Sequence, residues 1–281
     1  MRRIYTNING LRSFQSYFIE LIDSKYIIYE FIKRDLKIVY VQSITGPIFY
    51  ILFPILQCFV YLFLFGIFSS SAATLINFNI QNLLYFMATI PIWNLFVNSL
   101  IKGSSSYVIN YKIINKIYFS RLIFFITPFL VALFHFILQF IIFLFIYFLF
   151  YKDVNLFILL RIIIIPFVII YCFILSFSLS LLIASISLRY RDLVYSLNYI
   201  LQLGIFLTPV LYPLSKLSGL SLFIILLNPF SMVPEIFRWI FFNEQIIYPA
   251  VIFINLITGS LLLWVSLLIF RKNEKIVADL I

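Results

Sequence analysis

The sequence contains a stretch of 64 residues, 38–101, without Asp, Glu, Lys or Arg, and further uncharged stretches follow it. An α-helix needs about 20 apolar residues to cross the roughly 30 Å hydrocarbon core of a bilayer. Hydrophobic residues make up 64% of the chain and charged residues 11%, against about 45–50% and about 25% in soluble domains. A water-soluble particle of this size still needs a polar exterior. The pattern therefore excludes soluble enzymes, disordered tails and disulfide-rich secreted domains, and it predicts an all-α integral membrane protein.

The uncharged stretches predict six transmembrane helices. The first stretch is too long for one helix and is divided by the polar segment 69–82. The stretch 217–234 is short and interrupted by Gly219 and Pro229, so 214–243 is predicted to be a pair of short helices that re-enter the membrane from outside. The full spans are expected near 47–68, 83–101, 122–150, 163–187, 194–212 and 247–270.

The distribution of basic residues predicts the orientation of these spans. With the amino terminus inside, the inner segments 1–46, 102–121, 188–193 and 271–281 hold 16 of the 20 Lys and Arg residues. Cytoplasmic loops carry such an excess of basic residues. Both termini are therefore expected in the cytoplasm, with a transmembrane domain over 47–270. The net charge of +10 is interpreted as a topology signal facing anionic lipid, not as a nucleic-acid interface.

The cytoplasmic amino-terminal segment predicts an amphipathic helix that lies in the membrane interface. Lys25 and Asp35 interrupt its pattern, and a bend near Ser24 is expected. The segment is either a surface anchor or a movable lever, and the pattern leaves both open. The apolar side consists of Phe14, Phe18, Leu21, Ile28, Ile32, Leu36 and Val39, and the polar side mostly of Arg12, Asp23, Glu30, Arg34 and Lys37.

The sequence contains none of the common motifs for catalysis or for coupling transport to an ion gradient. There is no Gly-x-x-x-x-Gly-Lys-Ser/Thr loop, no paired His motif and no Asp or Glu in the assigned spans. His135 stands alone in the third span and is interpreted as structural, and Cys58 and Cys172 as small apolar residues. Charges throughout 1–37 argue against a cleavable signal peptide. We expect no enzyme activity, cofactor or metal in this chain, so energy for uphill transport must come from a partner.

The 35 Phe and 19 Tyr residues leave two interpretations open. Aromatic faces stack on sugar rings, which would suit a glycan pathway. The same residues can also simply face lipid.

Several local segments, in order along the chain, resemble one family. They are Arg34-Asp35-Leu36-Lys37, Pro91-Ile92-Trp93-Asn94, the loop from Asn110 to Arg121, Arg189-Tyr190-Arg191-Asp192, Thr208 to Pro213, Asn228-Pro229 and Phe237-Arg238. Together they resemble the membrane subunits of bacterial ABC exporters, the type-2 permeases that secrete O-antigen, capsule or teichoic acid. The resemblance covers roughly 30–270. Ser120 departs from it, because the family usually has Pro there.

The resemblance implies a homodimer in the bacterial plasma membrane, bound to two copies of an ATP-binding subunit that holds ATP and Mg²⁺. The substrate implied is an undecaprenyl-linked polysaccharide. The loop 102–121 would couple to the ATPase, with 189–192 nearby, although Lys112 and Lys116 can also be interpreted as charges that only set the topology. The implied functional residues are Asn110, Lys112, Asn115, Lys116 and Arg121 in the loop, Arg189, Arg191 and Asp192 in the turn, and Arg34, Asp35 and Lys37 in the interfacial helix.

The outer segment 214–243 is a candidate gate, because a channel wide enough for a sugar chain must be sealed at rest. Its candidate residues are Pro213, Asn228, Pro229, Glu235 and Arg238, with Glu235 and Arg238 expected to pair near the surface. An ordinary outer hairpin is the alternative. Other functions also stay open: an ABC exporter of another amphipathic substrate (lipid or drug), a flippase without an ATPase, or a membrane scaffold.

Overall fold

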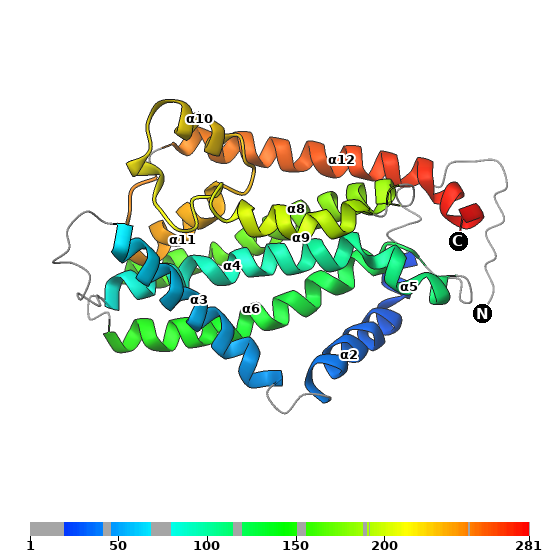
Figure 1. Cartoon of the computed structure of the whole chain (residues 1–281), viewed down its shortest axis with the longest axis horizontal. Helices are drawn as coiled ribbons and strands as arrows, with labels where there is room; N and C mark the ends of the chain where they lie inside the picture. Colours follow the sequence, from blue (N-terminus) through cyan, green and yellow to red (C-terminus); the bar gives the residue numbers. More distant parts are fainter. Residues whose placement is uncertain are drawn as a thin grey trace.

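A computed structural model of the chain describes residues 20–41, 46–68, 80–114, 120–150, 156–187, 190, 192–246 and 248–280. All regular structure in these ranges is helical, and the long helices run side by side as an elongated bundle (Figure 1). The all-α fold is therefore confirmed. The elements are α2 Lys25–Val41, α3 Gly46–Phe68, α4 Ile80–Ser104, α5 Ser106–Ile114, α6 Ile123–Phe150, α7 Leu156–Ile162, α8 Ile165–Ser187, α9 Asp192–Gly204, η2 Leu214–Lys216, α10 Gly219–Leu226, α11 Met232–Phe242 and α12 Pro249–Leu280.

Four helical stretches are long and apolar enough to cross a membrane. They are Asn82–Ser104, Ile123–Phe150, Leu160–Ser187 and Pro249–Asn273, which correspond to the second, third, fourth and sixth predicted spans. The first predicted span coincides with α3, whose apolar stretch Leu52–Phe63 is shorter, so its crossing stays a prediction.

The fifth predicted span, 194–212, is wrong in its extent. Helix α9 ends at Gly204, and turns follow through Val210. Pro209 has no N–H to continue a helix and disfavours helical geometry at Thr208. The Thr208 hydroxyl donates to the carbonyl of Gly204 at 3.1 Å, which satisfies one acceptor at the helix end. The apolar run continues beyond the helix, so a prediction based on hydropathy alone made the helix too long.

Helix α4 is the centre of the bundle, and α12 is at its periphery. In their apolar stretches 72% of the residues of α4 are buried, against 17% for α12. Small residues allow the helices to approach closely. A Cβ on Gly103 of α4 would lie 2.7 Å from Ser180 Cβ of α8, and one on Gly259 of α12 would lie 2.9 Å from the ring of Tyr171. Glycine is therefore required at both crossings.

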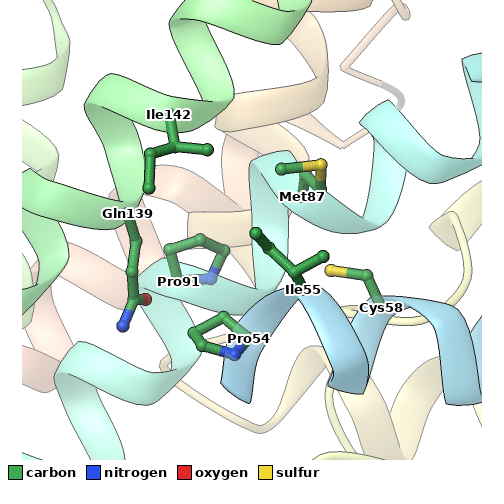
Figure 2. A pocket seen from close by; sticks show the side chains of 7 residues that line it. All are labelled: Pro54, Ile55, Cys58, Met87, Pro91, Gln139 and Ile142. Carbon is green, nitrogen blue, oxygen red and sulfur yellow. The ribbon is translucent and has the colours of Figure 1, made fainter. Parts of the chain in front are cut away.

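Two proline residues face a small cavity between α3, α4 and α6. Figure 2 shows Pro54 of α3 and Pro91 of α4 beside Gln139, which reaches in from α6. The cavity has a volume of about 10 Å³, room for about one water molecule. Each proline removes one backbone hydrogen bond from its helix. The two helical turns that lack a hydrogen bond and the Gln139 carboxamide thus lie together around one cavity.

The described part of the amino-terminal segment has the predicted amphipathic pattern. A turn at Ser24 separates residues 20–23 from α2, as expected. The apolar residues Leu21, Ile28, Ile32 and Leu36 are half-buried, whereas Asp23, Glu30 and Lys37 are exposed. The more amino-terminal members of the pattern lie outside the described residues. Helix α2 lies obliquely against the end of the bundle that carries α5 (Figure 1), and its position in the membrane interface stays a prediction.

The outer segment 214–243 contains two short helices, α10 and α11, joined by a turn. They lie at the end of the bundle opposite α5 (Figure 1). The prediction of a helix pair matches the observed elements, and its re-entry into the membrane stays a prediction.

Candidate functional site

The candidate site at the end of the bundle that is predicted to face the cytoplasm joins α2 and α5, two helices that are far apart in the sequence. Arg34 Nη1 of α2 donates a hydrogen bond to Asn110 Oδ1 of α5 at 3.3 Å. The Asn110 Nδ2 group donates to the carbonyl of Ser106 at 3.1 Å, which holds the carboxamide against its own helix. Two residues that the sequence assigned to separate segments are therefore in direct contact.

Helix α5 also contacts an irregular turn of α6. Pro128 cannot donate to the carbonyl of Phe124, four residues before it, because proline has no N–H. The hydroxyl of Ser106 donates to this carbonyl at 2.7 Å, and all three residues are buried. A residue of α5, in the loop predicted to be cytoplasmic, thus supplies the hydrogen bond that Pro128 removes from α6.

Arg34 is the central residue of this end. Its guanidinium lies 2.7 Å from Asp35 Oδ1, with side chains that are 37% and 27% exposed. The guanidinium also stacks over Phe31, 4.5 Å from the ring centre, and Phe31 packs edge-on against Phe124 of α6 at 5.4 Å. Lys37 is exposed. Interactions of moderate strength therefore attach α2 to the bundle.

The other predicted cytoplasmic residues are placed only in part. Arg121 is half-buried at the start of α6, and Asp192 is the exposed first residue of α9, where a carboxylate suits the positive end of the helix dipole. Lys112 lies in α5, but its side chain is outside the described part, as are Asn115, Lys116, Arg189 and Arg191. Their roles stay predictions.

At the outer end, Glu235 and Arg238 form an ion pair of 2.7 Å that is buried, with side chains 6% and 0% exposed. The predicted pairing is confirmed, but the expected position near the surface is wrong, because the polar side of α11 faces α4 and the turn after α9. Arg238 Nη2 donates to the carbonyl of Val210 at 2.9 Å, and Leu214 N donates to Glu235 Oε1 at 3.0 Å. The Arg238 and Glu235 side chains thus form hydrogen bonds with the Val210 carbonyl and the Leu214 N–H, two backbone groups of the turn.

Further contacts bind this turn to α4. Thr89 donates its hydroxyl to the same Val210 carbonyl at 2.9 Å. The Arg238 guanidinium lies over the ring of Tyr85, 4.4 Å from its centre. The irregular backbone at 205–214 is therefore fixed to α4 and α11 by one buried polar network, here called the outer latch: Tyr85, Thr89, Val210, Leu214, Glu235 and Arg238.

The remaining predicted gate residues form the turns beside the outer latch. Pro213 precedes the single turn Leu214–Lys216. Asn228 Oδ1 accepts from Phe230 N at 3.0 Å, as expected for a residue that satisfies the break, and the carbonyl of Pro229 lies 2.8 Å from Tyr171 Oη. Beyond α11, partial burial raises the pKa of the Glu244 carboxyl, although nearby Arg238 opposes the shift.

A groove between α3, α4, α6 and α9 has a volume of about 410 Å³. Its walls are apolar and aromatic, with Trp93 of α4 and Tyr61 of α3 among them. Six carboxamides line it: Gln57, Asn94, Asn98, Gln139, Asn198 and Gln202. Asn94 Nδ2 donates to Gln57 Oε1 at 3.1 Å across α3 and α4.

Sequence reasoning did not find this groove. The available signal was the placement of single Asn and Gln residues within otherwise apolar spans, since buried polar groups at membrane depth need partners. It also did not find Ser106, whose role depends on a proline in another helix. Thr89 was missed for a similar reason, because its acceptor lies in the turn after α9.

The long apolar helices, packed side by side, define the class, a multi-pass membrane protein. The sequence model of the ABC-2 type transporter family matches residues 27–242, most of the chain. The chain therefore belongs to this family and is the transmembrane subunit of an ABC transporter, which works with an ATP-binding subunit. No curated protein matches it significantly.

Proposed function

We propose that this chain is the permease of an ATP-driven exporter that moves a lipid-linked polysaccharide, of the O-antigen, capsule or teichoic acid type, out of the bacterial cytoplasm. It acts as a homodimer with two copies of a separate ATP-binding subunit, which holds the ATP and Mg²⁺. Both termini lie in the cytoplasm, and undecaprenyl-linked glycan is the substrate class. Within the family now assigned, the short segments that resemble polysaccharide exporters favour this substrate.

The observation that carries the proposal is the groove lined by carboxamides. Asn98 of α4 and Gln202 of α9 have exposed side chains, and both line the groove. Polar groups cost free energy when they face lipid, so such side chains face water, a second copy or a substrate. Carboxamides and aromatic rings together suit a hydroxyl-rich chain with apolar ring faces. A purely apolar lipid or drug would not need them.

Coupling to ATP hydrolysis is assigned to α5 and its surroundings. The Ser106 contact ties α5 to α6, and the Arg34 contact ties it to α2. A displacement of α5 by the ATP-binding subunit is therefore passed to a transmembrane helix and to the amphipathic helix through direct hydrogen bonds. Lys112 and Lys116 would contact the ATP-binding subunit, and the turn with Arg189, Arg191 and Asp192 would lie beside it.

The outer segment 214–243 is assigned as the gate. Its position at the far end from α5 and its two short helices support this role. The outer latch fixes the turn after α9 to α4 and α11, so opening would require these helices to move together. Pro213, Asn228 and Pro229 supply the irregular backbone between them.

The proposal is tested by deleting the gene from its host and expressing the chain with the ATP-binding subunit that co-purifies with it. Loss of surface glycan, with lipid-linked glycan accumulating inside, is expected, and the wild-type chain should restore export. A complex that exports a lipid or drug with unchanged surface glycan would replace the polysaccharide by that substrate. Export without any ATP-binding subunit would indicate a flippase and contradict the proposal.

A further inference from the structure

We propose that the carboxamide groove binds uncharged sugar units of the exported chain and discriminates against a polyanionic chain such as poly(glycerol phosphate). This inference rests on the proposed function and narrows its substrate class. The groove residues concerned are Gln57, Asn94, Asn98, Gln139, Asn198 and Gln202.

The first support is the chemistry of the lining. A carboxamide both donates and accepts hydrogen bonds, as a sugar hydroxyl does. The residues lining the groove within the described part of the chain include no Asp, Glu, Lys or Arg. Lys102, one residue beyond the lining residue Ile101, is not among them. A phosphate in each repeating unit would therefore enter the groove without a cationic partner, and burying an unpaired charge is costly.

The second support is the division of the carboxamides into two groups. Gln57 and Asn94 bond to each other at 3.1 Å, and Gln57 Nε2 also lies 3.4 Å from Tyr61 Oη, so these side chains are held in place. Asn98 and Gln202 are exposed and make no hydrogen bond to the described residues. They leave donors and acceptors available from α4 and α9. The groove thus offers two carboxamides held in a fixed orientation beside two whose donors and acceptors are available to a ligand. This combination is suited to a hydroxyl-rich ligand.

The third support is the aromatic wall. Trp93 packs against Phe96 and Phe230, with ring centres 5.8 and 5.4 Å away, and is almost fully buried. The indole also lies against α9, where a Cβ at Gly204 would be in ordinary contact with the ring at 3.4 Å. Half-buried Tyr61 of α3 adds a second ring. With a volume of about 410 Å³, the groove is within the usual range of about 300–1,000 Å³ for ligand pockets.

The test uses the complete complex of this chain and its ATP-binding subunit in lipid nanodiscs, with ATPase stimulation as the readout. The two probes are an undecaprenyl-diphosphate-linked neutral galactan and an undecaprenyl-linked poly(glycerol phosphate) of matched length. The neutral chain is expected to stimulate the ATPase, and the anionic chain is not. Asn98→Leu and Gln202→Met should each raise the half-maximal concentration of the neutral chain roughly fivefold, the loss of about one hydrogen bond.

Asn82→Leu is the matched control, because Asn82 is an exposed carboxamide on α4 outside the groove. It should leave the half-maximal concentration unchanged. Asn98→Gln, which keeps the carboxamide, should restore most of the response lost in Asn98→Leu.

The outcomes separate the inference from the proposed function. Stimulation by the anionic chain, or by the neutral chain with no effect of Asn98→Leu and Gln202→Met, would overturn the inference while leaving polysaccharide export intact. A complex that responds to neither chain would overturn the proposed function and the inference with it.

Discussion

The two ends of the bundle each contain an arginine–carboxylate pair at the same distance, in opposite surroundings. Arg34 and Asp35 lie 2.7 Å apart at the end predicted to face the cytoplasm, with side chains 37% and 27% exposed. Arg238 and Glu235 lie 2.7 Å apart at the outer end, 0% and 6% exposed. An exposed pair contributes about 0–1 kcal/mol, whereas removing one partner of a buried pair costs about 3–5 kcal/mol. The distance between the charged atoms therefore does not determine how much an ion pair contributes to stability.

The difference indicates a division of mechanical roles. The outer latch is a buried network whose members depend on one another, so it either holds or fails as a unit. The contacts of Arg34 at the opposite end are partly exposed, so they would be exchanged at low cost if α5 moves. A rigid outer end and an adaptable inner end would suit a transporter driven from the cytoplasm.

The comparison depends first on which end is outside. Single cysteines at Ser218 and Asn273, in a background with Cys58 and Cys172 replaced by Ala, should differ completely in intact cells. An impermeant thiol reagent is expected to label the cysteine at 218 and not the one at 273 until the membrane is opened. Labelling at 273 from outside would reverse the assignment of the two ends.

The largest energetic effect is expected at the outer latch. Arg238→Leu leaves Glu235 buried without its partner and should lower stability by about 3–5 kcal/mol. Protein that still inserts should leak ions in vesicles without ATP, as a loosened gate would. Arg161→Leu is the matched control, since Arg161 bonds Asn243 Oδ1 at 2.7 Å near the surface.

A second pair of measurements keeps this test decisive if Arg238→Leu does not accumulate. The double change Arg238→Leu with Glu235→Leu removes both charges and should be more stable than Arg238→Leu alone. Equal stability of the single and double variants, or an ion-tight single variant, would show that the pair does not hold the gate.

At the cytoplasmic end, reversing the charges of Lys112 and Lys116 should have the next largest effect. Lys112→Glu with Lys116→Glu is expected to reduce stimulation of the partner ATPase severalfold, because like charges at an interface weaken association. Topology should be kept, since 14 of the 16 inner basic residues remain. Wild-type ATPase stimulation and glycan export in the double variant would make these lysines topology charges only.

Ser106→Ala tests the link between α5 and α6. It leaves the Phe124 carbonyl buried beside Pro128 without its donor, which should cost about 1–3 kcal/mol in unfolding experiments. Ser106→Thr keeps the hydroxyl and serves as the control. If Ser106→Ala matches the wild type in stability and in ATPase stimulation, this hydrogen bond does not transmit movement.

The smallest effect is expected for Arg34→Gln. The change removes an exposed pair and a 3.3 Å hydrogen bond to Asn110, so stability should fall by at most about 1 kcal/mol. ATPase stimulation should fall more than stability does, because α2 loses its contact with α5. A stability loss as large as that of Arg238→Leu would remove the distinction between the two ends.

Much of the fold was predictable because membrane helices are encoded locally. Runs of apolar residues gave four spans within a few residues of the observed helices, and the stripe of Leu21, Ile28, Ile32 and Leu36 predicted α2. The fifth span was overstated because the apolar pattern continues through Thr208 and Pro209, whereas the backbone does not. Hydropathy depends on composition, so it does not indicate the residue at which a helix ends.

The candidate site was predictable only where a residue type carries its own chemistry. Glu235 and Arg238, three apart on a helix, were expected to pair, and they do. Their burial was not expected, because it depends on α4 and on a turn whose Val210 carbonyl, 28 residues before Arg238, accepts a hydrogen bond from it. The same holds for Asn110, whose partner Arg34 is 76 residues away.

The sequence by itself determined that the chain is a helical membrane protein, and its local motifs indicated the family, because both depend on residues that are neighbours in the chain. The tertiary structure decided which polar side chains meet. Ser106 finds the carbonyl freed by Pro128, Arg238 finds Val210, and the carboxamides of α3, α4, α6 and α9 line one groove. In a membrane interior each polar group must find a partner, and only the packing of the helices sets which groups come within hydrogen-bond distance.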